Sequence, residues 1–395
     1  MSVSIIATAH SKVGRSEKSI YELIEDIGRE VLEDAEIEAG QIGGIWLANY
    51  SGGGFNNQEH LAPYTMDIDE ELRFTPATRV ENACASGSAA IREAKNALEA
   101  GEVDYALVIG VEKMTDLDTK GVTKVLAMAS HWGTEGANGM TFPGLFAEYA
   151  KGYKSQYGLA DDELRETLAK IAAKNHRNAL ENPLAQMPWD CDYQEILDMP
   201  DKKNPMIAPP LRLYDCSLIS DGAAALIMSR TEDAKKLDND FVEIASLVQT
   251  SDYLEMNKRA KYEFTAGKKA IKEAYKKANI SVDDLDFAEV HDCFTIAELL
   301  AYEALGLAED GKGGEILGKG IVETDGKTPV NASGGLKAKG HPVGATGVSM
   351  AVLAARQILG NAIGHQVAGA ETGISFNIGG SAASNYAVVY KKGNK

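Results

Sequence analysis

The chain has few cysteines and no long hydrophobic run, and these absences exclude several classes of protein. Its 395 residues include 4 cysteines, Cys84, Cys191, Cys216 and Cys293, and no two of them form a C-x-x-C pair. This spacing provides no disulfide framework and is typical of a protein from a reducing compartment. No window approaches the roughly 18 consecutive apolar residues of a transmembrane helix.

Positive charge is also scarce. The chain has 40 lysines and arginines against 58 aspartates and glutamates, a net charge of -18. This balance disfavours nucleic acid and anionic membranes as partners. The first ten residues lack the basic region and cleavage site of a secretion signal, and the last five residues are not a peroxisomal address. We therefore expect a cytoplasmic protein.

The elements that can be predicted alternate between strands and helices. Residues 3–9, 44–48 and 104–111 are apolar runs that predict buried strands. Ser19 and Glu22 form a capping box in front of apolar residues at helical spacing, which predicts a helix. This alternation favours an α/β fold with a largely buried sheet.

A faint internal repeat suggests two related halves. A helix, turn and strand pattern around residues 35–45 returns 243 residues later, and Cys84-x-x-Gly87 is echoed by His341-x-x-Gly344 after 257 residues. Each echoed segment leads into a helix of small, apolar residues. We expect two central helices between two sheets, with a reactive residue at the start of each helix.

Composition changes between the two halves. Glycine, methionine, proline, asparagine and aromatic residues become frequent after about residue 115, and one amphipathic stretch covers residues 161–182. This composition predicts an inserted loop domain that acts as a lid. We assign residues 1–114 and 211–235 to the first half, 115–210 to the loop domain and 236–395 to the second half.

Three short segments carry the reactive side chains. Cys84 precedes a helix of small residues, where the helix dipole favours a thiolate. His341 lies in a glycine-rich loop that buries little apolar surface, so the loop needs another reason to be ordered. Ser333, in the same loop region, is a candidate substrate-binding residue. A structural cysteine and a turn with an incidental histidine are the alternatives.

His291 and Cys293 follow a strand-like run at residues 287–290. Side chains two residues apart on a strand share a face, so both can face a cleft where the strand ends. A solvated histidine and a core cysteine are the alternative. Zinc binding by Cys84, His291, Cys293 and His341 is disfavoured because structural zinc sites use closely spaced ligand pairs, which this chain lacks.

Taken together, the segments Glu81–Gly87, His291–Phe294 and Gly340–Gly347 resemble those of the thiolase superfamily. Lys174–His176 and Asp215–Ala224 extend the resemblance over essentially the whole chain. Many thiolases have Asn-Glu-Ala-Phe in place of His291–Phe294, and Cys-x-Gly-Gly-Gly in place of Asn377–Ser381. With its second cysteine at position 293, the chain resembles the sterol-carrier-protein thiolases and their archaeal relatives.

The resemblance implies a thiolase fold, with two duplicated halves in a layered α-β-α-β-α core and a loop-domain insertion. It also implies acyl transfer between thioesters and coenzyme A. His341 would take the proton of Cys84, and Cys84 would be acylated. Cys293 would then remove the α-proton of a second acyl-CoA. His291 and the N–H groups of Cys84 and Gly379 would stabilise the oxyanions.

For partners, the resemblance implies acetyl-CoA and CoA as substrate and product, with no cofactor and no metal ion. It implies a homodimer or tetramer that makes acetoacetyl-CoA for the mevalonate route. It further implies an assembly with hydroxymethylglutaryl-CoA synthase through a small zinc-binding OB-fold scaffold protein. A degradative 3-ketoacyl-CoA thiolase and a non-catalytic thiolase-like assembly subunit are the alternatives.

Overall fold

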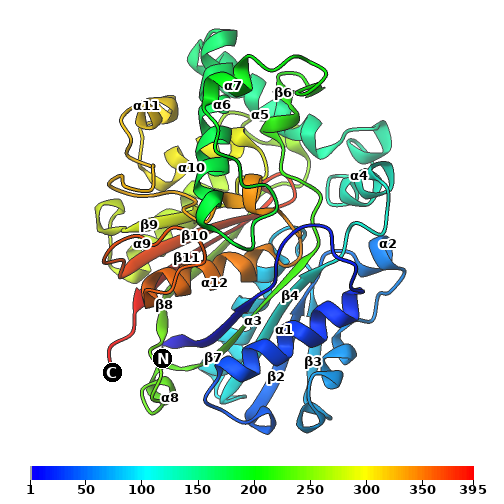
Figure 1. Cartoon of the computed structure of the whole chain (residues 1–395), viewed down its shortest axis with the longest axis vertical. Helices are drawn as coiled ribbons and strands as arrows, with labels where there is room; N and C mark the ends of the chain where they lie inside the picture. Colours follow the sequence, from blue (N-terminus) through cyan, green and yellow to red (C-terminus); the bar gives the residue numbers. More distant parts are fainter. Residues whose placement is uncertain (1) are drawn as a thin grey trace.

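A mixed sheet of nine strands organises residues 2–395, the part of the chain that this computed structural model describes (Figure 1). Its strand order is β3-β2-β4-β7-β1-β8-β11-β10-β9. The strands are β1 (Val3–His10), β2 (Ile42–Ala48), β3 (Ala77–Val80), β4 (Tyr105–Glu112), β7 (Gly222–Arg230), β8 (Val242–Ser251), β9 (Phe287–Val290), β10 (Thr372–Gly379) and β11 (Ser384–Lys392). The predicted strands at residues 3–9, 44–48, 104–111 and 287–290 are confirmed.

The same pattern of antiparallel and parallel pairing occurs on both sides of the β1–β8 pair. Moving outward from β1, antiparallel β7 and β4 are followed by parallel β2 and β3. Moving outward from β8, antiparallel β11 and β10 are followed by parallel β9, and an isolated parallel bridge joins Ala288 to Val330 where a fifth strand would lie. The two duplicated halves that the faint repeat predicted are therefore present.

Twelve α-helices are found among the described residues. They are α1 (Ile20–Asp34), α2 (Gly52–Asn56), α3 (Ser86–Ala100), α4 (Thr119–Ala127), α5 (Phe142–Tyr157), α6 (Asp161–Asn178), α7 (Tyr193–Leu197), α8 (Thr231–Ala234), α9 (Thr265–Ala278), α10 (Thr295–Leu305), α11 (Gly313–Gly318) and α12 (Thr346–Leu359). At α1, Ser19 and Glu22 form the predicted capping box. Within the described chain, no helix combines the length and the apolar character needed to cross a membrane.

Helices α3 and α12 lie at the centre of the molecule (Figure 1). Their apolar side chains form one core with strands of both halves, including β4, β7, β1, β8 and β11. Helix α1 packs on the opposite face of the first half, and α9 and α10 pack on the opposite face of the second. This gives the expected α-β-α-β-α layering.

One expectation about the sheet was wrong. The sequence predicted two separate sheets, whereas the structure joins the halves into one. The connection is short: Val3, Ser4 and Ile5 of β1 pair antiparallel with Ile244, Glu243 and Val242 of β8. Strand β1 is the first strand of the first half and β8 is the first strand of the second half, so their pairing makes one continuous sheet. A hydrophobic pattern alone cannot predict which strands pair.

Helices α4 to α7 and the small hairpin of β5 (Met206–Ala208) and β6 (Leu211–Arg212) are inserted between β4 and β7 in the sequence. They lie over one end of the layered core (Figure 1). The helix predicted over residues 161–182 is α6 followed by a short 3-10 turn, Ala179–Glu181. The reactive segments lie between this insertion and the two central helices.

Candidate active site

Cys84 occupies a sharp turn between β3 and α3. The preceding residue, Ala83, has φ of 51°, a left-handed conformation that is unfavourable for a residue with a side chain. Ser86 holds the turn: its hydroxyl accepts from the N–H of Asn82 and donates to the carbonyl of Ala83. The turn directs the Cys84 thiol towards the start of α12, which carries the second reactive segment.

Glycine allows the two central helices to approach each other closely. A Cβ atom added at Gly87 of α3 would lie 2.4 Å from the backbone nitrogen of Val348 and 2.8 Å from Cα of Gly347 in α12. A Cβ at Gly347 would lie 2.2 Å from the nitrogen of Ser88. The first turns of α3 and α12 therefore touch backbone to backbone, which fixes Cys84 relative to the loop that precedes α12.

The Cys84 thiol is buried and uncharged at rest. Burial raises its pKa to about 12, although the N–H groups of Gly380 and of Cys84 itself point to the sulfur and partly offset this effect. Thiolate formation therefore requires a base to accept the proton as the sulfur attacks. The same two N–H groups can stabilise negative charge beside the sulfur.

His341 is the base that the structure places beside Cys84. Its Nδ1 lies 2.7 Å from the hydroxyl oxygen of Thr346, and this hydroxyl donates its only hydrogen to the carbonyl of Pro342 at 3.0 Å. Thr346 must therefore accept from Nδ1–H, which leaves Nε2 of His341 unprotonated. Burial, reinforced by the positive charge of Lys339, lowers the pKa of His341 to about 3, so the ring is neutral.

His291 and Cys293 come from the other half of the chain, directly after β9. The rings of His291 and His341 are perpendicular, with centroids 4.9 Å apart. Ligand atoms of Cys84, His291 and His341 all lie within 4.8 Å of one another. Burial is the main cause that raises the pKa of Cys293 well above that of an ordinary thiol, and Cys84 nearby raises it further.

Both cysteines line one small cavity of about 60 Å³. Its other lining residues are mainly apolar or aromatic: Tyr50, Ala83, Leu126, Ala129, Phe142, Ser217, Phe294, His341, Val343 and Gly380. The structure thus brings four predicted residues together from three distant segments: Cys84, His291, Cys293 and His341. A nucleophile, a base and a second thiol around an apolar hollow provide what acyl transfer requires.

Two other predicted residues lie elsewhere. Ser333 is absent from the lining of this cavity in the described chain, because its hydroxyl donates to the buried carboxylate of Glu289 at 2.8 Å. Gly379 ends β10, and the neighbouring Gly380 directs its N–H to Cys84. The substrate contact of Ser333 and the oxyanion role of Gly379 stay predictions, and Gly380 is the glycine whose N–H faces the thiol.

A buried polar network ties these segments to the inserted helices. The Asp292 carboxylate accepts from the N–H of Leu336 at 2.6 Å and from the amide of Asn175 in α6 at 2.7 Å. Lys174 of α6 forms an ion pair of 2.9 Å with Glu298 of α10. Because Asp292 lies between His291 and Cys293, the network sets their position relative to the glycine-rich loop.

The supporting roles of several residues were not predicted from the sequence. Glu112, at the end of β4, accepts from the N–H groups of Tyr50 at 2.8 Å and Gly344 at 2.9 Å. Burial raises the pKa of Glu112 to about 7. Its place after a buried strand was the only available signal. Asp292 and Lys174 were visible in the motifs, but their partners are distant in the sequence.

Cys84, His291 and His341 are also the residues best placed to hold a metal ion, since sulfur and imidazole are zinc ligands. An ion bound there would occupy the lone pairs that nucleophilic attack requires. The same three groups therefore cannot hold a metal ion and perform acyl transfer at once.

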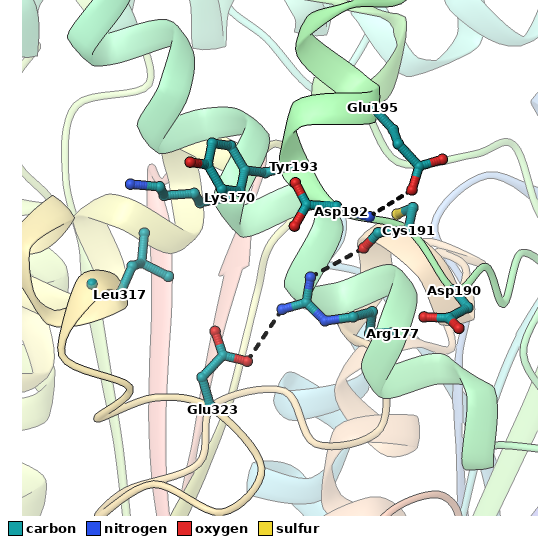
Figure 2. Close-up of a pocket in the computed structure, with 10 residues that line it drawn as sticks. Lys170, Arg177, Asp190, Cys191, Asp192, Tyr193, Glu195, Leu317 and Glu323 are labelled. Carbon is teal, nitrogen blue, oxygen red and sulfur yellow. Dashed lines mark hydrogen bonds and ion pairs between the residues drawn. The ribbon is translucent and has the colours of Figure 1, made fainter.

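A second hollow of about 520 Å³ lies between α6, α7 and α11 (Figure 2). There Arg177 donates to the carbonyl of Cys191 at 3.1 Å and lies 3.4 Å from the Glu323 carboxylate. Burial raises the pKa of the Cys191 thiol to about 12, and no histidine is among the described residues that line the hollow. The arrangement of a thiol beside a neutral histidine, present at Cys84, is therefore not repeated among the residues that line this hollow.

Comparison with known proteins gives consistent matches over nearly the whole chain. The thiolase N-terminal domain family matches residues 3–232, and the thiolase C-terminal domain-like family matches residues 248–392. An acetyl-CoA acetyltransferase of Methanothermobacter thermautotrophicus is 39% identical over 381 residues, covering 96% of each chain. An acetyl-CoA acetyltransferase of Methanocaldococcus jannaschii is 40% identical over 352 residues, covering 88% of this chain and 87% of the relative.

Among solved structures, the fold is similar to that of the Ltp2-ChsH2(DUF35) aldolase. The TM-score is 0.80 at 18% sequence identity, and the match covers 100% of this chain and 98% of the other. At 18% sequence identity, this similarity shows a shared fold and nothing about function.

Proposed function

The chain belongs to the thiolase family, and from that premise we propose that it is an acetyl-CoA C-acetyltransferase. It would condense two molecules of acetyl-CoA to acetoacetyl-CoA and CoA. The observation that carries the proposal is the shared cavity of Cys84 and Cys293, with His341 as a neutral base beside Cys84. The two relatives named acetyl-CoA acetyltransferase support the choice of acetyl-CoA as substrate.

In the first half-reaction, Cys84 Sγ attacks the carbonyl carbon of acetyl-CoA while its proton moves to Nε2 of His341. Both groups are uncharged at rest, so proton transfer accompanies the attack. The tetrahedral intermediate collapses by breaking the bond to the CoA sulfur. The imidazolium returns the proton to that sulfur, and acetyl-Cys84 and CoA-SH remain.

In the second half-reaction, Cys293 removes an α-proton from a second acetyl-CoA. Cys293 first gives its own proton to Nε2 of His341, which lines the same cavity. Because its pKa is raised, the resulting Cys293 thiolate is a strong base, and the α-proton that it takes stays on its sulfur. The carbanion attacks the carbonyl carbon of acetyl-Cys84, and the Cys84 thiolate leaves and takes the proton back from His341. N–H groups directed at the developing negative charge lower the barrier of both steps.

The size of the cavity favours a short acyl group. Its volume is only about 60 Å³. Phe142, Phe294 and Leu126 are among the bulky side chains that line it. This favours condensation of acetyl groups over the alternative, degradation of long 3-ketoacyl-CoA.

The test is to measure thiolysis of 3-ketoacyl-CoA over a series of chain lengths, together with acetoacetyl-CoA formation from acetyl-CoA alone. We expect the highest kcat/KM for acetoacetyl-CoA, with a steep fall as the chain lengthens. A preference for long chains would favour the degradative alternative. Purified chain that binds acetyl-CoA without acylation or condensation would favour the non-catalytic subunit.

We further propose that the product feeds hydroxymethylglutaryl-CoA synthase in the mevalonate pathway. Condensation of two acetyl-CoA molecules is uphill, so a partner that consumes acetoacetyl-CoA would drive it. A small zinc-binding OB-fold scaffold protein would hold the two enzymes together. The name of one structural neighbour includes a DUF35 component, which motivates the search for such a partner.

A homodimer or tetramer is the proposed assembly of the chain itself. Strand β3 lies at one edge of the sheet, where its outer side has no strand partner among residues 2–395. Light scattering and co-purification at native expression test these proposals. A monomer would contradict the homo-oligomer, and an oligomer that never retains a synthase would contradict the complex.

A further inference from the structure

Asn377 lies beside His291 and the backbone of Cys84. It lies on β10 and is 1% exposed. Its Nδ2 is 2.9 Å from Nδ1 of His291 and 3.3 Å from the carbonyl oxygen of Cys84. Its Oδ1 is 2.8 Å from the hydroxyl of Ser88 in α3. The side chain therefore joins the nucleophile turn, the start of α3 and the His291 ring.

These contacts determine the orientation of the Asn377 amide. The carbonyl of Cys84 can only accept a hydrogen bond, so the amide atom facing it must be the NH₂ group. The Ser88 hydroxyl then donates to Oδ1. Because the NH₂ group also faces His291, it supplies the hydrogen between the two side chains, and Nδ1 of His291 must accept it.

The orientation of the amide in turn sets the tautomer of His291. A neutral imidazole carries one hydrogen, and an Nδ1 that accepts a hydrogen bond leaves this hydrogen on Nε2. The ring is 1% exposed, and its Nε2 has no hydrogen-bond partner within residues 2–395. A buried donor without a partner is uncommon and indicates a functional role.

We propose that Asn377 is a positioning residue that holds His291 as the Nε2–H tautomer, so that His291 donates to a thioester oxygen that becomes negatively charged during the reaction. The proposal rests on the acyl transfer proposed above. Thr346 holds His341 in the opposite tautomer, with its hydrogen on Nδ1. The two adjacent rings thereby have different roles: His341 accepts the thiol proton, and His291 donates to the oxyanion.

The amide suits this role because its NH₂ group has two hydrogens. One can point to His291 and the other to the carbonyl of Cys84. A carboxylate at the same place has no hydrogen to donate, so it would require a hydrogen on Nδ1 of His291. A neutral ring in that state has no hydrogen on Nε2 and cannot donate to the oxyanion.

The direct test combines ¹⁵N-histidine labelling with the isosteric change Asn377→Asp. A His291→Asn variant assigns the His291 signals. We expect the wild-type ring to show an unprotonated Nδ1 and a protonated Nε2. In Asn377→Asp, Nδ1 should be protonated. A wild-type ring with its hydrogen on Nδ1, or an unchanged Nδ1 in the Asp variant, would overturn the proposal.

Kinetics provide the second readout. Near neutral pH, Asn377→Asp should lower kcat about 10²-fold, the usual effect of losing one oxyanion donor, with little change in KM. Its activity should recover at lower pH, where the ring gains a second hydrogen and Nε2–H returns. Asn204→Asp is a matched control, because Asn204 is also 1% exposed but contacts backbone groups of Ile196 and Tyr214. Near-wild-type kcat in Asn377→Asp would overturn the proposal.

The two proposals fail separately. If the wild-type chain neither acylates nor condenses acetyl-CoA, the proposed function fails, while the ¹⁵N spectrum still reports which nitrogen of His291 carries the hydrogen. If Asn377→Asp does not fold, the wild-type spectrum alone decides whether Asn377 donates to Nδ1.

Discussion

Replacing Gly87 with alanine should separate the two helices that hold the reactive residues. The added Cβ would lie 2.4 Å from the backbone nitrogen of Val348, where ordinary contact begins at 3.4 Å. Because backbone atoms cannot rotate away, α3 and α12 must move apart by about 1 Å, the difference between these distances. Overpacking of this kind destabilises a protein by about 1–3 kcal/mol.

The expected effect on catalysis is larger than the effect on folding. A misplacement of about 1 Å between reacting groups can lower the rate about 10²-fold. Cys84 lies just before α3 and His341 just before α12, so their separation changes with the helices. We expect Gly87→Ala to remain folded and to lose kcat for acetoacetyl-CoA thiolysis by about this factor.

Steady-state kinetics and urea unfolding, measured on the same preparation, provide the assay. Gly318→Ala is the matched control, because a Cβ there meets no described atom within 4 Å. That variant should keep its activity and its stability. If Gly87→Ala has a kcat close to that of the wild type, the helix crossing does not set the catalytic geometry, and the reasoning is refuted.

Three other predictions concern the reactive groups. Cys293→Ala should still acylate Cys84 but form no acetoacetyl-CoA, as measured by chromatography of the products; normal condensation would contradict the role of Cys293. Thr346→Val removes the acceptor of His341 Nδ1–H and should lower kcat by about 10²-fold, the lower end of the contribution of a positioned base, with little change in KM; an unchanged kcat would show that the tautomer of His341 needs no such support. Because the pKa of Cys84 is raised to about 12, the small thiolate fraction of the resting enzyme should grow about tenfold per pH unit between pH 5 and 8, so alkylation of Cys84 should be slow and should rise with pH without levelling off; a rate that levels off within this range would indicate a thiol with a lowered pKa.

Much of the fold could be predicted from local signals. The capping box at Ser19 and the apolar runs at β1, β2 and β4 depend on neighbours in the sequence, and the structure has these elements. The continuous sheet could not be predicted. It depends on the β1–β8 pair, which joins residues about 240 positions apart and leaves no mark in either hydrophobic pattern.

The active site likewise has a part that could be predicted from local sequence and a part that could not. Cys84 and His341 stand in segments rich in glycine and small residues, and His291 and Cys293 follow a strand-like run. These local signals made all four predictable, and the structure brings them together. The tautomers of the histidines depend on Thr346 and Asn377, whose hydrogen-bond partners become evident only in three dimensions. Gly380 rather than Gly379 faces the thiol because the chain turns immediately after β10, and a turn shifts by one residue without a clear change in sequence.

The central claim is that Cys84 carries the acyl group, and trapping this intermediate tests it most directly. Intact-protein mass spectrometry of the Cys293→Ala variant after exposure to acetyl-CoA, followed by peptide mapping, locates any acetyl group. The account predicts one acetyl group per chain, on Cys84, and none in a Cys84→Ser variant that remains folded. Acetylation at another residue, or equal labelling of the Cys84→Ser variant, would contradict it.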